Sequence, residues 1–176
     1  SKPISDVPEM GIGSQPIDDG NYLFTDEQKN EFLQREPGAK KFFHKWLGSQ
    51  EFIRGKSRWC LWLGNAKWDE LKNLPICRER VEAVRQYRLK SKRSQTVKAA
   101  ERPAHFGTEI LSDTDSILIP EVSSSRRRYI PMGFVDSSVF CSNKVRLIPN
   151  ATLYQYGVLQ SQLHNAWVRV VTGSLK

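Results

Sequence analysis

The sequence of 176 residues contains only three cysteines, three histidines and no long apolar run. Cys60, Cys77 and Cys141 are far apart and form no Cys-x-x-Cys pair, so we expect buried free thiols and no disulfide framework. The histidines show no metal-ligand spacing, and we expect no metal site. No apolar stretch approaches the ~20 residues of a membrane span and no signal peptide is visible, which predicts a cytoplasmic protein without a membrane partner.

Common catalytic motifs are also missing from the sequence. It has no glycine-rich phosphate loop, no Gly-x-Ser-x-Gly elbow and no His-Glu-x-x-His. Ser161 and His164 could supply a nucleophile and a base, but no third member is evident and a helical pattern explains both. We therefore expect no catalytic residue and no cofactor in this chain.

Positive charge, by contrast, is abundant. The sequence has 27 Lys and Arg against 19 Asp and Glu, a net charge of +8 and a pI of about 9.5. A balance this basic favours a polyanionic partner such as DNA or RNA. The hydrophobic content of 39%, with 10% aromatic residues, is typical of a globular chain, and the length suits one domain.

Local patterns predict an irregular N-terminal lead-in over residues 1–24, followed by a single domain over residues 25–176. Thr25-x-x-Gln28 is a capping box, which predicts a helix that ends at Pro37. We expect Trp59, Trp62 and Trp167 in the core. Further helices are expected over residues 39–47, 68–74 and 77–98 and near the C-terminus up to Gly173, and strands over residues 51–55, 58–63, 117–119, 129–134, 139–141 and 145–148. This order predicts an α+β fold, a twisted and mostly antiparallel sheet flanked by helices.

The most informative stretch lies between two expected strands, where three serines precede three arginines: Ser123, Ser124, Ser125, Arg126, Arg127 and Arg128. Guanidinium groups and small hydroxyls read base edges in the grooves of DNA. In an extended segment, alternate side chains would face opposite sides, so that one set could enter a groove. The stretch therefore predicts DNA base contacts, and the alternative is a surface loop with incidental charge.

The helix expected over residues 77–98 carries a one-signed excess of charge, which predicts phosphate contacts along a duplex. The residues assigned to this role are Arg78, Arg85, Arg88, Lys92 and Arg93. A solvated helix face is the alternative. The polar and aromatic segment that leads into the last helix offers further possible DNA contacts at Asn150, Tyr154 and Gln155, or simply a capped helix entry.

Several ordered strings in the sequence resemble those of one family, the target-recognition domains of MmeI-like DNA methyltransferases, which combine restriction and modification in one polypeptide. The likeness spans almost the whole chain. The strings are IDDGN from Ile17, RWCLWL from Arg58, RERVEAVR from Arg78, VSS from Val122, RRRYIP from Arg126, IPNATLY from Ile148 and LHNAWVR from Leu163.

The resemblance implies that this chain is the DNA recognition part of a larger enzyme, in which a catalytic domain of the same polypeptide methylates adenine N6 with S-adenosylmethionine. A nuclease could precede that domain. Such enzymes flip the target base out of the duplex, and the recognition domain selects the site on double-stranded DNA. Many relatives carry an acidic residue where this chain has Ser125, and a carboxylate there could accept a hydrogen bond from cytosine N4. The chain itself lacks the Asn-Pro-Pro-Tyr motif of the catalytic domain.

Two other functions are compatible with the basic composition. An RNA-binding module would need exposed aromatic side chains for stacking on bases. A protein-interaction domain would use the basic helix to bind an acidic partner.

Overall fold

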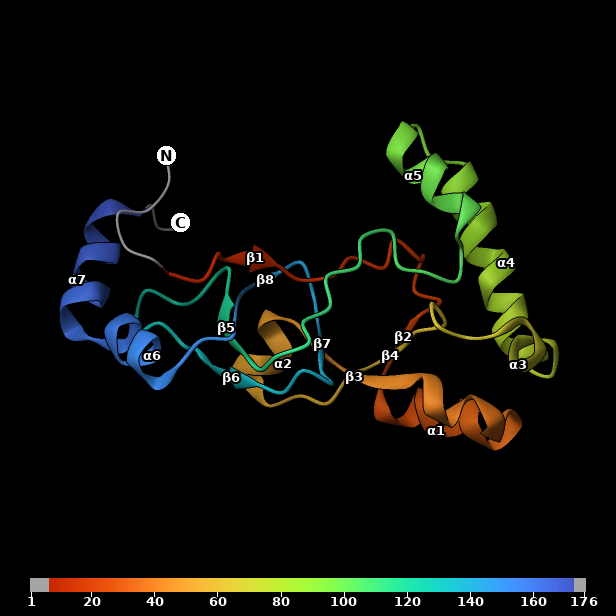
Figure 1. Ribbon diagram of the computed structural model, residues 1–176, viewed down its shortest axis with the longest axis horizontal. Coiled ribbons are helices and arrows are strands. Elements are labelled where there is room, and N and C mark those ends of the chain that lie inside the picture. Colours follow the sequence, from red (N-terminus) through yellow and green to blue (C-terminus); the bar gives the residue numbers. More distant parts are fainter. Residues whose placement is uncertain (1–6, 173–176) are drawn as a thin grey trace.

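The computed structural model describes residues 7–172, and over that range it has two four-stranded sheets with helices at both ends of its long axis (Figure 1). The predicted α+β fold with mostly antiparallel pairing is confirmed, although the strands form two sheets where one was expected. In the described part of the chain, no helix is both long enough and apolar enough to cross a bilayer.

The first sheet has the strand order β1-β8-β5-β6, and all its neighbouring strands are antiparallel. Its central strand β5 is buried on both faces, because Leu118 packs into one hydrophobic cluster and Ile117 into another on the opposite side. The second of these clusters includes Tyr156 and Leu159 of helix α6 (Leu153–Gln160). The strands are β1 (Gly11–Ile12), β5 (Ser116–Pro120), β6 (Gly133–Val135) and β8 (Val145–Pro149).

The second sheet has the order β2-β4-β3-β7, with β3 and β7 parallel. Its core is aromatic: the rings of Phe24, Phe32 and Phe43 meet edge to face, with centroids 5.0 to 5.6 Å apart. Trp59 and Trp62 are half-buried and pack against this core. The strands are β2 (Leu23–Phe24), β3 (Phe43–Leu47), β4 (Trp59–Leu61) and β7 (Phe140–Cys141).

The helices differ in how well local signals predicted them. The capping box of Thr25 is confirmed, since Thr25 Oγ1 accepts from the Gln28 N–H at 3.3 Å and the Gln28 side chain accepts from the Thr25 N–H at 3.0 Å. The elements are α1 (Asp26–Arg35), η1 (Pro37–Phe42), α2 (Ser49–Arg54), α3 (Trp68–Lys72), α4 (Pro75–Leu89), α5 (Ser94–Lys98), η2 (Ala99–Glu101), α6 (Leu153–Gln160) and α7 (Gln162–Val171).

Two predictions in the N-terminal half were wrong. The helix expected over residues 39–47 is a short 3₁₀ helix followed by strand β3, because that segment pairs with β4 on one side and β7 on the other. The strand expected over residues 51–55 is helix α2. Gly48 begins α2, where its N–H donates to Glu51 Oε2 at 3.0 Å, and Gly55 ends it in the left-handed conformation with φ +62°.

Both long helices predicted in the C-terminal two thirds are broken. The helix expected over residues 77–98 ends at Leu89, and the chain turns before α5. The last helix is divided at Ser161, whose Oγ accepts from the His164 N–H at 3.2 Å and caps α7. Within the strand expected over residues 129–134, only its last two residues belong to β6. The expected C-cap Gly173 lies outside the described residues.

The N-terminal segment, the cysteines and Trp167 can also be compared with their predicted positions. Residues 7–24 contribute β1 to the first sheet and β2 to the second, so this segment joins both sheets. Cys60, Cys77 and Cys141 are buried free thiols, as predicted. Trp167, in contrast, is 60% exposed and does not belong to the core.

Candidate nucleic-acid interface

The serine-arginine stretch forms part of the loop that joins β5 to β6 in the first sheet. This loop does not run straight. The Arg127 N–H donates to the Ser124 carbonyl at 3.1 Å, and the Arg126 N–H donates to Ser124 Oγ at 3.3 Å, so the chain turns within the stretch. The expected alternation of side chains between two faces is therefore wrong, because it requires an extended backbone.

The three guanidinium groups of this loop are accessible. Arg126, Arg127 and Arg128 are exposed, and none of them forms an ion pair with a carboxylate in the described part of the chain. The Arg128 guanidinium lies over the Tyr129 ring, 5.4 Å from its centroid. Three unpaired cations on one loop form a site suited to an anionic or base-edge partner.

The serines of the loop differ in their surroundings. Ser124 and Ser125 are exposed, whereas Ser123 is half-buried and its hydroxyl has no contact with solvent and no hydrogen-bond partner within residues 7–172. A buried hydroxyl without a partner costs about 1–3 kcal/mol. A ligand group that reached Ser123 would remove this cost.

Side chains of helices α6 and α7 hold the C-terminal half of this loop through hydrogen bonds to its backbone. The Ile130 N–H donates to Asn165 Oδ1 at 2.8 Å, and the Ile130 carbonyl accepts from Gln160 at 2.9 Å. Arg169 donates to the carbonyls of Arg127 and Arg128, the latter at 2.8 Å. These holding residues were not predicted, although Asn165 and Arg169 both lie in the LHNAWVR string.

In the basic helix, one predicted phosphate contact is wrong. Arg88 is fully buried and lies on the inward stripe of α4 with Cys77 and Val84, eleven and four residues away. Its guanidinium donates to the backbone carbonyls of five residues at 2.8 to 3.3 Å, and burial lowers its pKa from the ordinary arginine value. The five are Pro16, Ile17, Ala99, Arg102 and His105. Arg88 therefore joins the N-terminal segment to the chain after α5 and has no donor free for a phosphate.

The other end of α4 is held by a carboxylate. Glu36 is buried and accepts the N–H groups of Ile76 at 3.1 Å and Cys77 at 2.9 Å, which otherwise lack partners in the first turn of a helix. Glu36 and Arg88 thus fix the direction of α4 from its two ends.

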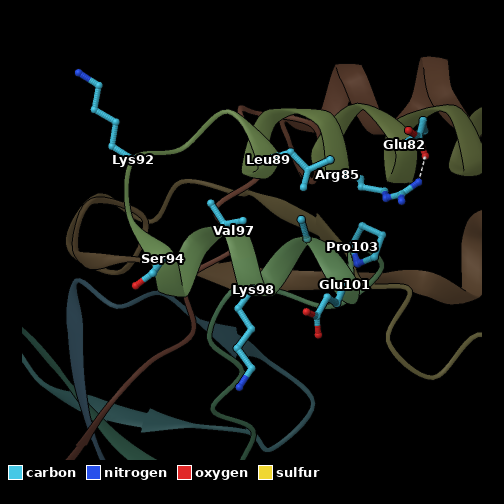
Figure 2. A pocket seen from close by; sticks show the side chains of 10 residues that line it. Glu82, Arg85, Leu89, Lys92, Ser94, Val97, Lys98, Glu101 and Pro103 are labelled. Atoms are coloured by element: carbon cyan, nitrogen blue, oxygen red, sulfur yellow. Dashed lines mark ion pairs between the residues drawn. The ribbon is translucent and has the colours of Figure 1, made fainter.

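The remaining four predicted phosphate contacts, Arg78, Arg85, Lys92 and Arg93, are exposed. Arg85 forms an ion pair with Glu82 at 3.7 Å, and the others have no carboxylate partner among the described residues. An open hollow of about 800 Å³ lies between α4 and the segment of α5 and η2. Figure 2 shows the side chains that line it. Leu89 and Val97 face each other across it, whereas Lys92 and Lys98 extend away into solvent.

The segment before α6 places Tyr154 77% exposed at the start of the helix. Asn150 has a left-handed backbone with φ +53°, which asparagine tolerates better than most residues. The Gln155 side chain accepts from the Thr152 N–H at 2.8 Å and completes a capping box. Gln155 therefore caps the start of α6, whereas the exposed side chain of Tyr154 is available for a contact.

The two cationic features lie at opposite ends of the long axis. In Figure 1, α4 and α5 stand at one end, and α6 and α7, which hold the serine-arginine loop, stand at the other. They do not form one local site. A single ligand that contacted both would have to extend along the molecule, as a duplex does.

Over residues 7–172, no three His, Cys, Asp or Glu side chains are grouped so that they could hold a metal ion. The clearest polar cluster is built around Glu109. Burial raises the pKa of Glu109, but hydrogen bonds from Trp62 at 2.8 Å and from His105 outweigh burial and hold this pKa below its usual value. These contacts stabilise the fold around the second sheet.

Comparison with known proteins places this geometry in a family. The chain is 39% identical to DNA methyltransferase A of Bacillus subtilis (strain 168) over 176 residues, all of this chain and 20% of the relative. It is 45% identical to the Type IIL restriction-modification enzyme MmeI in a solved complex with DNA, with a TM-score of 0.95 over 99% of this chain and 23% of the MmeI chain. The chain thus spans about a fifth of the relatives' length. The model of the MmeI target recognition domain matches residues 1–176, and the chain belongs to this family.

Proposed function

We propose that this chain selects the double-stranded DNA sequence on which a larger DNA methyltransferase of the restriction-modification type acts. The observation that carries the proposal is the likeness to MmeI, which was solved with DNA and shares 45% identity and a TM-score of 0.95 with nearly the whole chain. The net charge of +8 supports the same partner.

The proposed base-reading residues are those of the β5–β6 loop: Ser123, Ser124, Ser125, Arg126, Arg127 and Arg128. The hydrogen-bonding chemistry of these side chains supports the assignment. Arginine forks pair with the O6 and N7 atoms of guanine, and each such pair discriminates by about 1–3 kcal/mol. The guanidiniums are exposed and have no carboxylate partner among the described residues, and side chains of α6 and α7 bind the backbone of the loop. Both observations favour a loop that is held in place while its arginine side chains remain accessible.

The proposed phosphate contacts are Arg78, Arg85, Lys92 and Arg93, with Arg88 removed from the set. Arg85 is the weakest of the four because Glu82 already offsets its charge. Contacts to phosphates carry no sequence information but set register and orientation on the duplex. Tyr154, exposed in the first turn of α6, remains a candidate contact, and Asn150 and Gln155 are secondary candidates.

Methyl transfer itself is assigned to the rest of the proposed polypeptide. The chain lacks catalytic motifs, and it covers 20% of a relative described as a DNA methyltransferase. We propose that the remainder holds S-adenosylmethionine, flips an adenine and methylates its N6, in the cytoplasm. The catalytic domain would then lie against this chain on the same duplex.

The test is selection from a randomised duplex library with the parent polypeptide and with its Arg127→Ala and Arg128→Ala variants. We expect the parent to enrich one short motif and each variant to relax one or two positions of it. Lys56→Ala, an exposed cation in the turn after α2, is the matched control and should leave the motif unchanged. Failure of the parent to enrich any motif, or equal competition by single-stranded RNA, would contradict the proposal.

A further inference from the structure

Helix α7 exposes an apolar stripe. Leu163, Trp167 and Val170 are 82%, 60% and 85% exposed, although large apolar side chains are usually covered. Their spacing of four and three residues puts them within about 60° of one another around the helix. Of the 17 exposed large hydrophobic residues in the described chain, seven lie in α6 and α7, so the exposure is concentrated there.

The outward direction of this stripe is set by the opposite side of the helix. Asn165 is 3% exposed, accepts from the Ile130 N–H, and donates to the carbonyls of Leu159 at 3.2 Å and Ser161 at 2.9 Å. Rotating the helix to bury Trp167 against the body would break these bonds. The stripe can therefore be covered only by something that comes from outside the described chain.

The chemistry of the stripe excludes a nucleic-acid backbone as its occupant. The single Lys or Arg of α7 is Arg169, and its guanidinium already donates to the carbonyls of Arg127 and Arg128. Spacing of this kind fits a second apolar helix or an apolar groove. Two of the three side chains, Leu163 and Val170, are aliphatic and offer no ring for stacking on bases, so the occupant should be protein.

We propose that this stripe docks onto the catalytic part of the same polypeptide, an inference that rests on the proposed function. The matched region makes up 20% of one relative and 23% of the other, so more than three quarters of each chain lies outside it. A partner in the same chain is present at a high effective concentration and needs only a modest surface.

This docking would give α7 two faces with two tasks. One face holds the serine-arginine loop through Asn165 and Arg169, and the other, the apolar stripe, binds the catalytic part. The helix would then set the distance between the bases that are read and the base that is methylated.

The test measures the accessibility of the stripe, not DNA binding. Leu163→Cys is introduced both into the 176-residue chain and into the full-length polypeptide, with Gln34→Cys on the exposed face of α1 as the matched control. Because the native cysteines of this chain are buried, a maleimide should label the new thiol, and mass spectrometry identifies the labelled peptide. We expect Leu163→Cys to react at least tenfold more slowly in the full-length polypeptide than in the chain, and Gln34→Cys to react equally in both.

Equal rates for Leu163→Cys in the two settings would overturn the proposal. Protection that grows with the concentration of the 176-residue chain would assign the stripe to a second copy and also overturn it. Hydroxyl-radical oxidation of Trp167 in the wild-type proteins gives the same comparison without a variant. None of these readouts involves DNA, so they separate this inference from the proposed function.

Discussion

The guanidinium of Arg169 in α7 donates a hydrogen bond of 2.8 Å to the backbone carbonyl of Arg128, 41 residues earlier in the chain. The bond holds the backbone of the serine-arginine loop, while the side chain of Arg128 stays exposed beside the Tyr129 ring. A cation that holds a loop and a cation that the loop presents are thus adjacent, and they can be separated by mutation.

Replacing Arg169 should weaken DNA binding without removing a DNA contact. Arg169→Met deletes donors to two carbonyls, and a hydrogen bond from a charged donor contributes about 1.5–3 kcal/mol, less at an exposed site. We expect about a fivefold to tenfold loss of affinity for the selected duplex, measured by fluorescence anisotropy. Arg54→Met in α2 is the control. Unchanged affinity would mean that the loop does not need this support.

Ser125→Glu should change the preferred base. A glutamate carboxylate only accepts hydrogen bonds and so favours the N4 amino donor of cytosine. A serine hydroxyl can donate or accept and so does not select cytosine. We expect one position of the recognised motif to shift toward cytosine in library selection. Ser125→Ala removes the hydroxyl without adding charge and should not produce this shift. A cytosine preference in neither variant would remove Ser125 from the base-reading set.

The salt dependence of binding should identify the phosphate contacts. Each cation that neutralises a phosphate adds about 0.9 to the slope of log affinity against log salt. Lys92→Ala and Arg93→Ala should each lower the slope by about that amount and weaken all duplexes alike. Lys56→Ala should not change it. A change of specificity in either variant would instead indicate base contact.

Arg88→Met should destabilise the fold. The change removes five hydrogen bonds from a charged donor. The carbonyls of Pro16, Ala99 and Arg102 still accept from backbone N–H groups. Among the described residues, those of Ile17 and His105 lose their donor, and a buried unsatisfied group costs about 1–3 kcal/mol. We expect a loss of at least about 3 kcal/mol in the free energy of unfolding, measured from urea denaturation. Arg85→Met on the exposed side of α4 should cost under about 0.5 kcal/mol. A small loss for Arg88→Met would contradict its role as the junction of these segments.

The cysteines should resist thiol reagents and make stability fall at alkaline pH. Burial raises the pKa of Cys77 and of Cys141 to about 12, and that of Cys60 further. A raised pKa means that the folded state keeps protons that the unfolded state releases, so stability declines as pH rises above the ordinary thiol value of 9.0. Thiol titration at pH 8 should detect none of the three until denaturant is added. Rapid labelling of the native protein would contradict the burial.

Sequence signals predicted part of the candidate site and missed the part that depends on distant partners. The loop arginines followed from residue type alone, since three adjacent charges do not suit a core. The misassignment of Arg88 came from counting charges along the helix. Its spacing to Cys77 and Val84 put it on the buried stripe, but its five acceptors come from segments up to 72 residues away.

The local sequence determined the capped start of α1, the central strands β4 and β5, and the basic character of the chain. It also determined the sequence strings that carry the family resemblance. These features depend on residues within a few positions of one another. The tertiary structure decided which cations are free, where the long helices break, and that Trp167 faces outward. The physical reason is that the role of a guanidinium or an indole depends on which groups the fold places next to it. Arg88 donates to five carbonyls and is buried, and Arg169 donates to a loop backbone. Arg127 has no acidic partner among the described residues and is exposed.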